Sequence, residues 1–222
     1  MKNSTNKLET FARWRAEGPA RFAVEALGVP SKWNGSEGVL DWQWEASKAL
    51  VDHDRIAIRS GHGVGKSAFE AWTILWFQSC HFPAKLPVTA PTGHQLRDIL
   101  WAELAKWWRR MKTHAPELAQ EFEWKTEVFE LKSHPRESFA VARTSRPENP
   151  EAFQGFHSEN LMFLGDEASG IAEEVYVVGE GALSTKGAKV LLCGNPTRTR
   201  GSFCLCRRDD GHLITHLACS LS

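Results

Sequence analysis

The sequence has no excess of either charge, few cysteines and no long apolar run. Its 27 basic and 27 acidic residues give a formal net charge of zero, so any contact with DNA must come from local patches. The five cysteines include no CxxC pair and no zinc-site spacing, which favours reduced thiols. No apolar stretch approaches the length of a membrane span, and the first residues lack the apolar segment of a signal peptide. We therefore expect a soluble, intracellular protein without a membrane partner.

The chain has 222 residues, of which 42% are hydrophobic and 24% charged, as in an ordinary globular domain. Apolar strand patterns alternate with helical patterns from residue 40 onward, which predicts a mainly parallel sheet covered by helices. We expect helices over 40–51, 67–80, 93–111 and 173–183, strands over 54–59, 86–90, 161–164, 189–193 and 213–218, and a hairpin of 123–132 with 138–143. Residues 1–40 are expected to form a helical lead-in, broken at Gly18-Pro19, before an α/β domain over 41–222.

A glycine-rich turn lies between the first predicted strand and the following apolar helix. It reads SGHGVGKS, which matches the P-loop pattern GxxxxGK[ST] except at its first glycine. Small residues are needed here because backbone N–H groups must approach phosphate oxygens closely. Lys66 would contact the β- and γ-phosphates and Ser67 would bind Mg²⁺. The predicted ATP-binding residues of the turn are Ser60, Gly61, His62, Gly63, Val64, Gly65, Lys66 and Ser67.

Two carboxylates follow the apolar strand predicted over 161–164. In a parallel sheet, residues after the strand end lie at the ligand-binding edge. We expect Asp166 to hold Mg²⁺ and Glu167 to position and activate the attacking water. Together with the glycine-rich turn, this pair predicts an ATPase of the α/β P-loop NTPase fold (ASCE, RecA-like).

Three further stretches make the sequence resemble phage terminase large subunits. The stretch DWQWE at 41–45 resembles their adenine-recognition segment, in which Trp42 and Gln43 would contact the base while Trp44 packs in the core. The stretch DEASGI at 166–171 resembles their acidic motif. The stretch LCGNPTRTRG at 192–201 resembles their coupling motif, in which Asn195 or Thr197 would sense the γ-phosphate. The motifs APT at 90–92 and QGFH at 154–157 also match.

The resemblance covers about residues 40 to 205 and implies a DNA-packaging motor. It implies ATP and Mg²⁺ as cofactors, double-stranded DNA, a portal protein and a terminase small subunit as partners, and an active homo-oligomeric ring. It further implies a phage or prophage protein of the host bacterial cytoplasm. A helicase-like DNA-dependent ATPase and an inactive remnant that serves as an interaction domain are the alternatives.

The sequence departs from the family pattern in two places. His62 occupies the position of an arginine that many such motors carry in the loop, so the charge-stabilising arginine is unassigned. Arg59 is close but lies at the strand end, and the candidates are Arg143, Arg146, Arg198 and Arg200. No second acidic cluster follows the coupling motif, and Asp209-Asp210 is interpreted as a solvated turn. We therefore expect an ATPase fragment, a split gene product or a truncated remnant, without a nuclease domain or nuclease activity.

Two basic groups are candidate DNA contacts. The stretch WWRRMK at 107–112 combines aromatic and basic residues, but helix C-termini attract cations in any case, and we favour this structural explanation. The second group lies beside the coupling motif and comprises Arg198, Arg200, Arg207 and Arg208.

Overall fold

The computed structural model describes residues 2–144, 153, 155–182, 187–195, 203 and 213–216, without the side chains of 2–6, 178–182 and 213–216. The helices are α1 (Lys2–Glu17), α2 (Pro19–Ala26), α3 (Asp41–Asp52), α4 (Lys66–Cys80), the π-helix η1 (Gln95–Trp101), α5 (Ala102–His114), α6 (Pro116–Gln120), the short 3₁₀-helix η3 (Ala168–Gly170) and α7 (Glu173–Ala182). The strands are β1 (Arg55–Arg59), β2 (Ala84–Thr89), β3 (Phe122–Trp124), β4 (Val128–Leu131), β5 (Phe139–Ala142), β6 (Asn160–Gly165), β7 (Lys189–Gly194) and β8 (Leu213–His216). Among these described residues, no helix is long and apolar enough to cross a membrane.

The strands form one sheet in the order β3-β4-β5-β2-β6-β7-β1-β8. All pairs from β5 to β8 are parallel, and only β3-β4 and β4-β5 are antiparallel. β7 therefore lies between the strand that precedes the phosphate loop and the strand that precedes the two carboxylates. This is the predicted α/β fold with a mainly parallel central sheet.

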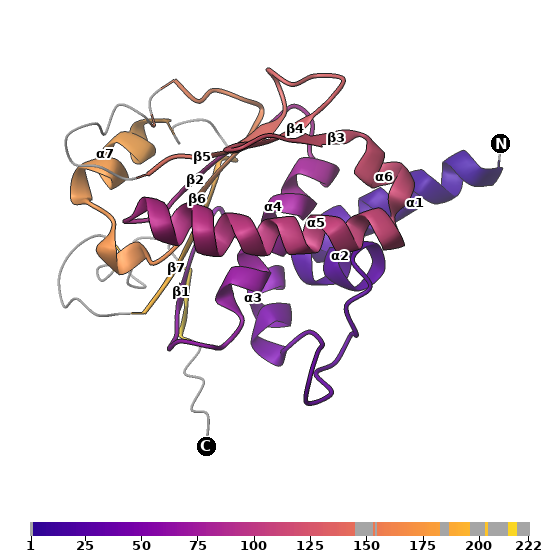
Figure 1. The fold of residues 1–222 in the computed structure, drawn as a ribbon, viewed down its shortest axis with the longest axis horizontal. Helices are drawn as coiled ribbons and strands as arrows, with labels where there is room; N and C mark the ends of the chain where they lie inside the picture. The colour runs from indigo at the N-terminus through magenta and orange to yellow at the C-terminus, as the bar shows by residue number, and fades with distance from the viewer. Residues whose placement is uncertain are drawn as a thin grey trace.

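Helices cover both faces of the sheet (Figure 1). Alternate residues of β1 show this directly, because Ile56 and Ile58 pack in the large cluster with α1–α5, whereas Ala57 packs in a second cluster with α7. The strands β6 and β7 divide their apolar side chains between the two clusters in the same way. A strand buried on both faces is apolar at every position, which explains the continuous apolar runs in the sequence.

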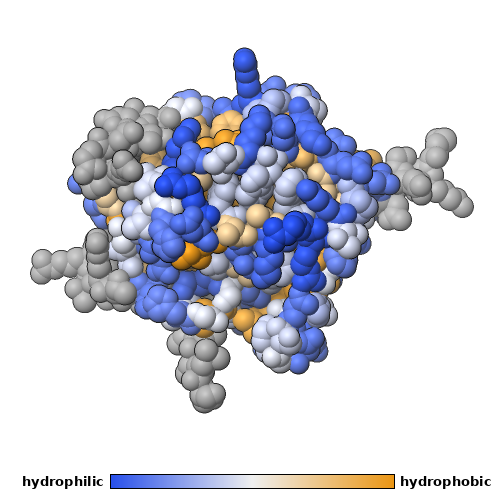
Figure 2. Space-filling view, in the orientation of Figure 1, coloured by the Kyte–Doolittle hydropathy of each residue, from blue (hydrophilic) through white to orange (hydrophobic). Residues whose placement is uncertain are grey.

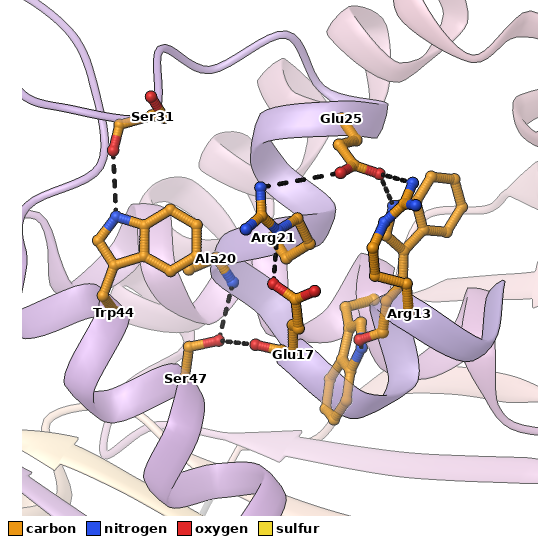
Figure 3. A network of polar contacts seen from close by, with 10 residues as sticks. Arg13, Glu17, Ala20, Arg21, Glu25, Ser31, Trp44 and Ser47 are labelled. Carbon is orange, nitrogen blue, oxygen red and sulfur yellow. Dashed lines mark hydrogen bonds and ion pairs between the residues drawn. The ribbon is translucent and has the colours of Figure 1, made fainter. Parts of the chain in front are cut away.

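The first two helices pack against α3 and α4. Gly18 separates α1 from α2 with φ of 81°, and a Cβ there would lie 2.6 Å from the Ser47 Oγ. That hydroxyl accepts a hydrogen bond from the Ala20 N–H and donates one to the Glu17 carbonyl, at 3.1 and 2.9 Å (Figure 3). The predicted break at Gly18-Pro19 is confirmed, and it exists because α3 approaches the chain closely there.

The hairpin prediction was partly wrong. β4 and β5 do form an antiparallel pair, but residues 123–132 contain parts of two strands, β3 and β4, rather than one. The Lys125 N–H donates to the Val128 carbonyl at 2.7 Å and closes a turn between them. The predicted helix over 93–111 is also different, because its first part is the π-helix η1.

His81 follows α4 and is buried against Phe77, with ring centroids 4.5 Å apart. Burial lowers the pKa of His81 to about 4, below its ordinary value of 6.5. The folded state therefore favours the neutral imidazole. Above pH about 6.5 this group does not change the free energy of unfolding, and it lowers that free energy increasingly as the pH falls from about 6.5 toward 4.

We expect His81→Phe to reduce the acid-induced loss of unfolding free energy in this range by up to about 3 kcal/mol. Urea unfolding at pH values between 7 and 4 measures this loss of unfolding free energy, and a variant at the exposed His94, His94→Asn, is the control. An unchanged acid-induced loss in His81→Phe would contradict the assignment.

Candidate active site

The glycine-rich turn leads directly from β1 into α4, as the sequence predicts. Gly63 and Gly65 have φ of 75° and 86°, the left-handed region that glycine enters without strain. Residues 61–63 are exposed, and a Cβ on Gly61 or Gly63 would meet nothing within 4 Å. The loop therefore presents its backbone to open space in front of the N-terminus of α4. Such a terminus favours anions because its first N–H groups have no partner within the helix.

Lys66 is buried and folds back over this loop. Its Nζ donates to the Gly61 carbonyl at 2.6 Å and is 3.4 Å from the Ser60 carbonyl. The Ser60 Oγ is buried and has no hydrogen-bond partner among the described residues. The ammonium is thus held at the loop by carbonyl groups, which a phosphate group could replace as its partners.

The loop is tied to the neighbouring strand ends. The Ser60 N–H donates to the Gly194 carbonyl at 3.2 Å, which joins the ends of β1 and β7. The Asp166 N–H donates to the Thr89 carbonyl at 2.9 Å, which joins the end of β6 to β2. A Cβ on Gly194 would lie 2.8 Å from the Ala168 nitrogen, so the segment after β6 passes directly over the end of β7. Phosphate loop, carboxylates and Asn195 therefore meet at one edge of the sheet.

Asp166 is 4% exposed, and its carboxylate accepts a hydrogen bond from the Glu167 N–H at 2.8 Å. Burial, and then the charge of Glu167, raise the pKa of Asp166 to about 6. Lys66 opposes this rise, so the ammonium and the carboxylate interact across the site. A buried carboxylate crowded by a second carboxylate is a group that a cation would stabilise.

Glu167 has φ of 46° and ψ of 45°, and among the described residues it is the one non-glycine residue with positive φ. A left-handed backbone costs free energy for a residue with a side chain. Such residues concentrate at functional sites, where the surrounding structure holds them in place. The strain therefore falls on the residue predicted to activate water.

Glu70 is a site residue that the sequence interpretation missed. It is fully buried on α4, one turn after Lys66, and its carboxyl group lies against the Asp166 carboxyl and the Cys193 thiol. Burial, and then the charge of Asp166, hold the pKa of Glu70 well above its ordinary value. The Cys193 thiol on β7 adjoins it, and burial likewise raises the pKa of that thiol. A single acidic residue in the apolar stretch KSAFEAW is the signal that could have revealed it.

The oxygen donors present suit Mg²⁺. Ser67 is the second residue of α4, and the Asp166 carboxylate after β6 interacts with the neighbouring Lys66. Hydroxyl and carboxylate oxygens are ligands that Mg²⁺ prefers, and it commonly takes only one or two from the protein and the rest from phosphate and water. No group of three or more histidine, cysteine or acidic residues forms a complete metal cage in the described part of the chain. The arrangement fits a metal held jointly with a nucleotide.

Trp42 and Gln43 lie behind the loop. The Trp42 Nε1–H donates to the Val64 carbonyl at 3.1 Å, and the Gln43 amide donates to the Gly65 carbonyl at 3.2 Å while accepting from the Leu40 N–H at 2.9 Å. Both side chains brace the loop and also line a cavity of about 830 Å³. Its other walls come from residues 29–40, α4 and α5. This volume is typical of small-molecule sites.

Trp44 instead packs against the core and donates its Nε1–H to the Ser31 carbonyl at 3.1 Å. Asn195 follows β7 and lies with its Nδ2 3.3 Å from the His62 Nε2, which connects the predicted phosphate sensor to the loop. Thr197 lies outside the described residues.

The arginines considered for charge stabilisation are only partly described. Arg59, at the end of β1, is held by Phe203: its Nη2 donates to the Phe203 carbonyl at 2.7 Å and its guanidinium lies over the Phe203 ring. Arg143 is exposed beyond β5. Outside the described residues lie Arg146, Arg198, Arg200, Arg207, Arg208, Asp209, Asp210 and Gln154 of the motif QGFH.

In the stretch 107–112, Trp107 is buried against Trp72 and Arg110 bonds to the backbone of residues 27 and 28. The structure therefore gives these two residues packing roles, in agreement with the explanation favoured for the stretch as a helix end. Arg109 and Lys112 lie at the solvent-facing side of α5, where Lys112 is exposed.

Comparisons with known proteins find the same fold in phage large terminases. The chain is 30% identical over 148 residues to the "Probable terminase, large subunit" of Enterobacteria phage P7, which is 66% of this chain and 30% of that protein. It superposes on the large terminase ATPase domain of Thermus phage P74-26 with a TM-score of 0.56 at 16% identity, covering 80% of this chain and 69% of that one.

Two further solved structures agree. The large terminase of a thermophilic bacteriophage in complex with ADP gives a TM-score of 0.55 at 16% identity, over 79% of this chain and 42% of that one. The HK97 bacteriophage large terminase gives a TM-score of 0.55 at 14% identity, over 77% of this chain and 37% of that one. No protein-family model matches the chain. The resemblance to the ATPase part of terminase large subunits is confirmed, and the chain spans about a third of the length of the curated relative.

Proposed function

We propose, from this shared fold and the geometry of the sheet edge, that the chain binds ATP with Mg²⁺ and hydrolyses it to move double-stranded DNA into a phage prohead. The observation that supports the proposal most is that the phosphate loop after β1 and the two carboxylates after β6 meet at one edge of the sheet, where Lys66 and Asp166 are both buried. A phosphate loop without such carboxylates would favour a passive nucleotide-binding protein. The ADP complex of the terminase from the thermophilic bacteriophage further supports nucleotide binding.

The triphosphate would lie along residues 60–67, within reach of the backbone N–H groups and the N-terminus of α4. Lys66 would exchange the Gly61 carbonyl for oxygens of the β- and γ-phosphates. Ser67 and Asp166 would hold Mg²⁺, which when bound supplies positive charge that offsets the phosphates and the carboxylates. The base would enter the cavity beside Trp42 and Gln43.

Glu167 would orient a water toward the γ-phosphorus and accept its proton. A bond forms between the water oxygen and the γ-phosphorus, the bond to the β–γ bridging oxygen breaks, and ADP and phosphate leave. Asn195, next to His62, would detect the loss of the γ-phosphate and transmit it to the segment that follows. A ring of copies on a portal protein, with a terminase small subunit, completes the proposal by family analogy.

The DNA part of the proposal predicts that double-stranded DNA stimulates phosphate release by the purified chain. We expect the stimulation to weaken steeply with salt, because contacts to the DNA backbone release counterions. This stimulation is measured as the ratio of phosphate release with and without linear duplex DNA, at increasing ionic strength. Unwinding of a forked duplex would assign the chain to helicase-like ATPases instead. Hydrolysis that is unaffected by DNA at every salt concentration would contradict a DNA motor.

A further inference from the structure

The loop over residues 27–40 forms one wall of the cavity beside the phosphate loop. Its contribution comprises Val29, Trp33, Ser36, Glu37, Gly38 and Leu40, and the opposite walls come from Gly63–Gly65, α4 and α5. This loop lies outside the motifs that predicted the site. Gly38 has φ of 137°, and a Cβ there would lie 2.1 Å from the Lys32 carbonyl oxygen, so the loop doubles back tightly on itself.

Arg110 of α5 fastens this loop. Its Nε donates to the Leu27 carbonyl at 3.0 Å, its Nη2 donates to the Gly28 carbonyl at 2.8 Å, and its Nη1 pairs with the Glu37 carboxylate. One guanidinium thus holds both ends of the segment 28–37. Its planar array of donors makes this possible, and a lysine could not reproduce it.

A second anchor comes from α3. The Trp44 indole donates to the Ser31 carbonyl, as Figure 3 shows. Within the loop, the Val39 N–H donates to the Pro30 carbonyl at 2.9 Å, and the Asn34 Oδ1 accepts from the N–H groups of Ser36 and Glu37 at 3.0 and 2.8 Å. These contacts fix the backbone of the loop on both sides of Trp33.

Trp33 is 51% exposed although it lines the cavity. The face of the molecule in Figure 2 is mainly hydrophilic, with small separate hydrophobic areas. The other large hydrophobic residues found exposed in the described ranges are Leu8, Phe82, Ile99 and Val177, and none of them lines this cavity. An exposed indole at the wall of a cavity that begins at a phosphate loop is placed to meet a flat aromatic ligand.

We propose that Trp33 stacks on the nucleotide base and that Arg110 is the positioning residue that holds it there. This rests on the proposed function, because the phosphates on residues 60–67 direct the base into the cavity. The indole supplies an apolar face that any purine can use, and the two anchors avoid the entropic cost of ordering the loop on binding. Arg110 itself does not line the cavity, and besides holding the loop its guanidinium lies over the ring of Trp107 in the opposite wall, 5.1 Å from the centroid.

The test compares the affinity of the purified chain for ATP and for tripolyphosphate, which has the phosphates without a base. Isothermal titration calorimetry with Mg²⁺ gives both dissociation constants. We expect the wild type to bind ATP more tightly than tripolyphosphate. Trp33→Leu should weaken ATP binding by about tenfold, in the range of a base–aromatic stack, and leave tripolyphosphate binding unchanged. Trp33→Phe should retain most of the ATP affinity, and Phe82→Leu, the matched exposed aromatic outside the cavity, should retain all of it.

Arg110→Ala should cause the same selective loss of ATP affinity, and the double variant with Trp33→Leu should lose little more, because both act through one contact. A general defect of folding would instead weaken tripolyphosphate binding as well, and would overturn the positioning role. Equal ATP affinity in wild type and Trp33→Leu would overturn the stacking role while leaving the phosphate site intact. Failure of the wild type to bind either ligand would contradict the proposed function itself.

Discussion

Replacing Lys66 by alanine is expected to lower the rate of ATP hydrolysis by roughly 10²- to 10³-fold, the range found when one preorganised charge or hydrogen-bond donor is removed. Among the described residues, Lys66 is the cation that opposes the raised pKa values of both Asp166 and Glu70. Without it, the triphosphate would face these carboxylates with no ammonium between them. Binding should weaken as well, because the lysine contacts the phosphates in the ground state. Phosphate release and calorimetric titration measure the two effects.

The control is Lys48→Ala, which removes an exposed lysine that pairs with Asp52 on the surface. This variant should hydrolyse ATP at the wild-type rate, since exposed ion pairs of this kind contribute little. Circular dichroism should show both variants folded, because the hydrogen bonds that Lys66 makes go to the Ser60 and Gly61 carbonyls of its own loop and tie together no distant elements. A folded Lys66→Ala protein that hydrolyses ATP at the wild-type rate would show that the phosphate loop is not part of the catalytic site.

Glu167→Gln is expected to lower hydrolysis by roughly 10²- to 10⁴-fold while ATP binding stays close to that of the wild type. The amide keeps the shape of the side chain but cannot accept the proton of the attacking water. The backbone N–H of residue 167 still bonds to Asp166, so the geometry of the strand end is preserved. Single-turnover hydrolysis separates this chemical defect from binding, which calorimetry measures.

The matched control is Glu174→Gln, an exposed acid in the first turn of α7. This variant should change neither the rate of ATP hydrolysis nor the affinity for ATP. Suppose that Glu167→Gln hydrolyses ATP normally while Asp166→Asn does not. Activation of the water would then have to be assigned to a group other than Glu167. If Glu167→Gln lost ATP binding together with hydrolysis, its role would be structural.

The parts of the site that could be predicted are those built from contiguous residues. The order of apolar strand, glycine-rich turn and apolar helix fixes the position of the phosphate loop, and an apolar strand ending in Asp166 and Glu167 fixes the opposite side. Parallel pairing then brings both to one edge without further information. The sheet of β1, β2, β6 and β7 follows from the same patterns.

The parts that could not be predicted depend on contacts between distant segments. Glu70 is recognisable in the sequence only as an acidic residue within an apolar helix, and the fold is needed to show that it is buried beside Asp166 and Cys193. Arg110 reads as a cation at a helix end, yet it fastens a loop more than 70 residues earlier in the chain. The split between β3 and β4 depends on a turn at 125–127 that carries neither glycine nor proline.

Steady-state phosphate release by the purified chain decides whether this sheet edge hydrolyses ATP. We expect turnover of ATP that disappears on chelation of divalent cations and is lost in Lys66→Ala and Glu167→Gln. Turnover that persists in both variants, or a wild type that binds ATP and Mg²⁺ yet releases no more phosphate than they do, would contradict it.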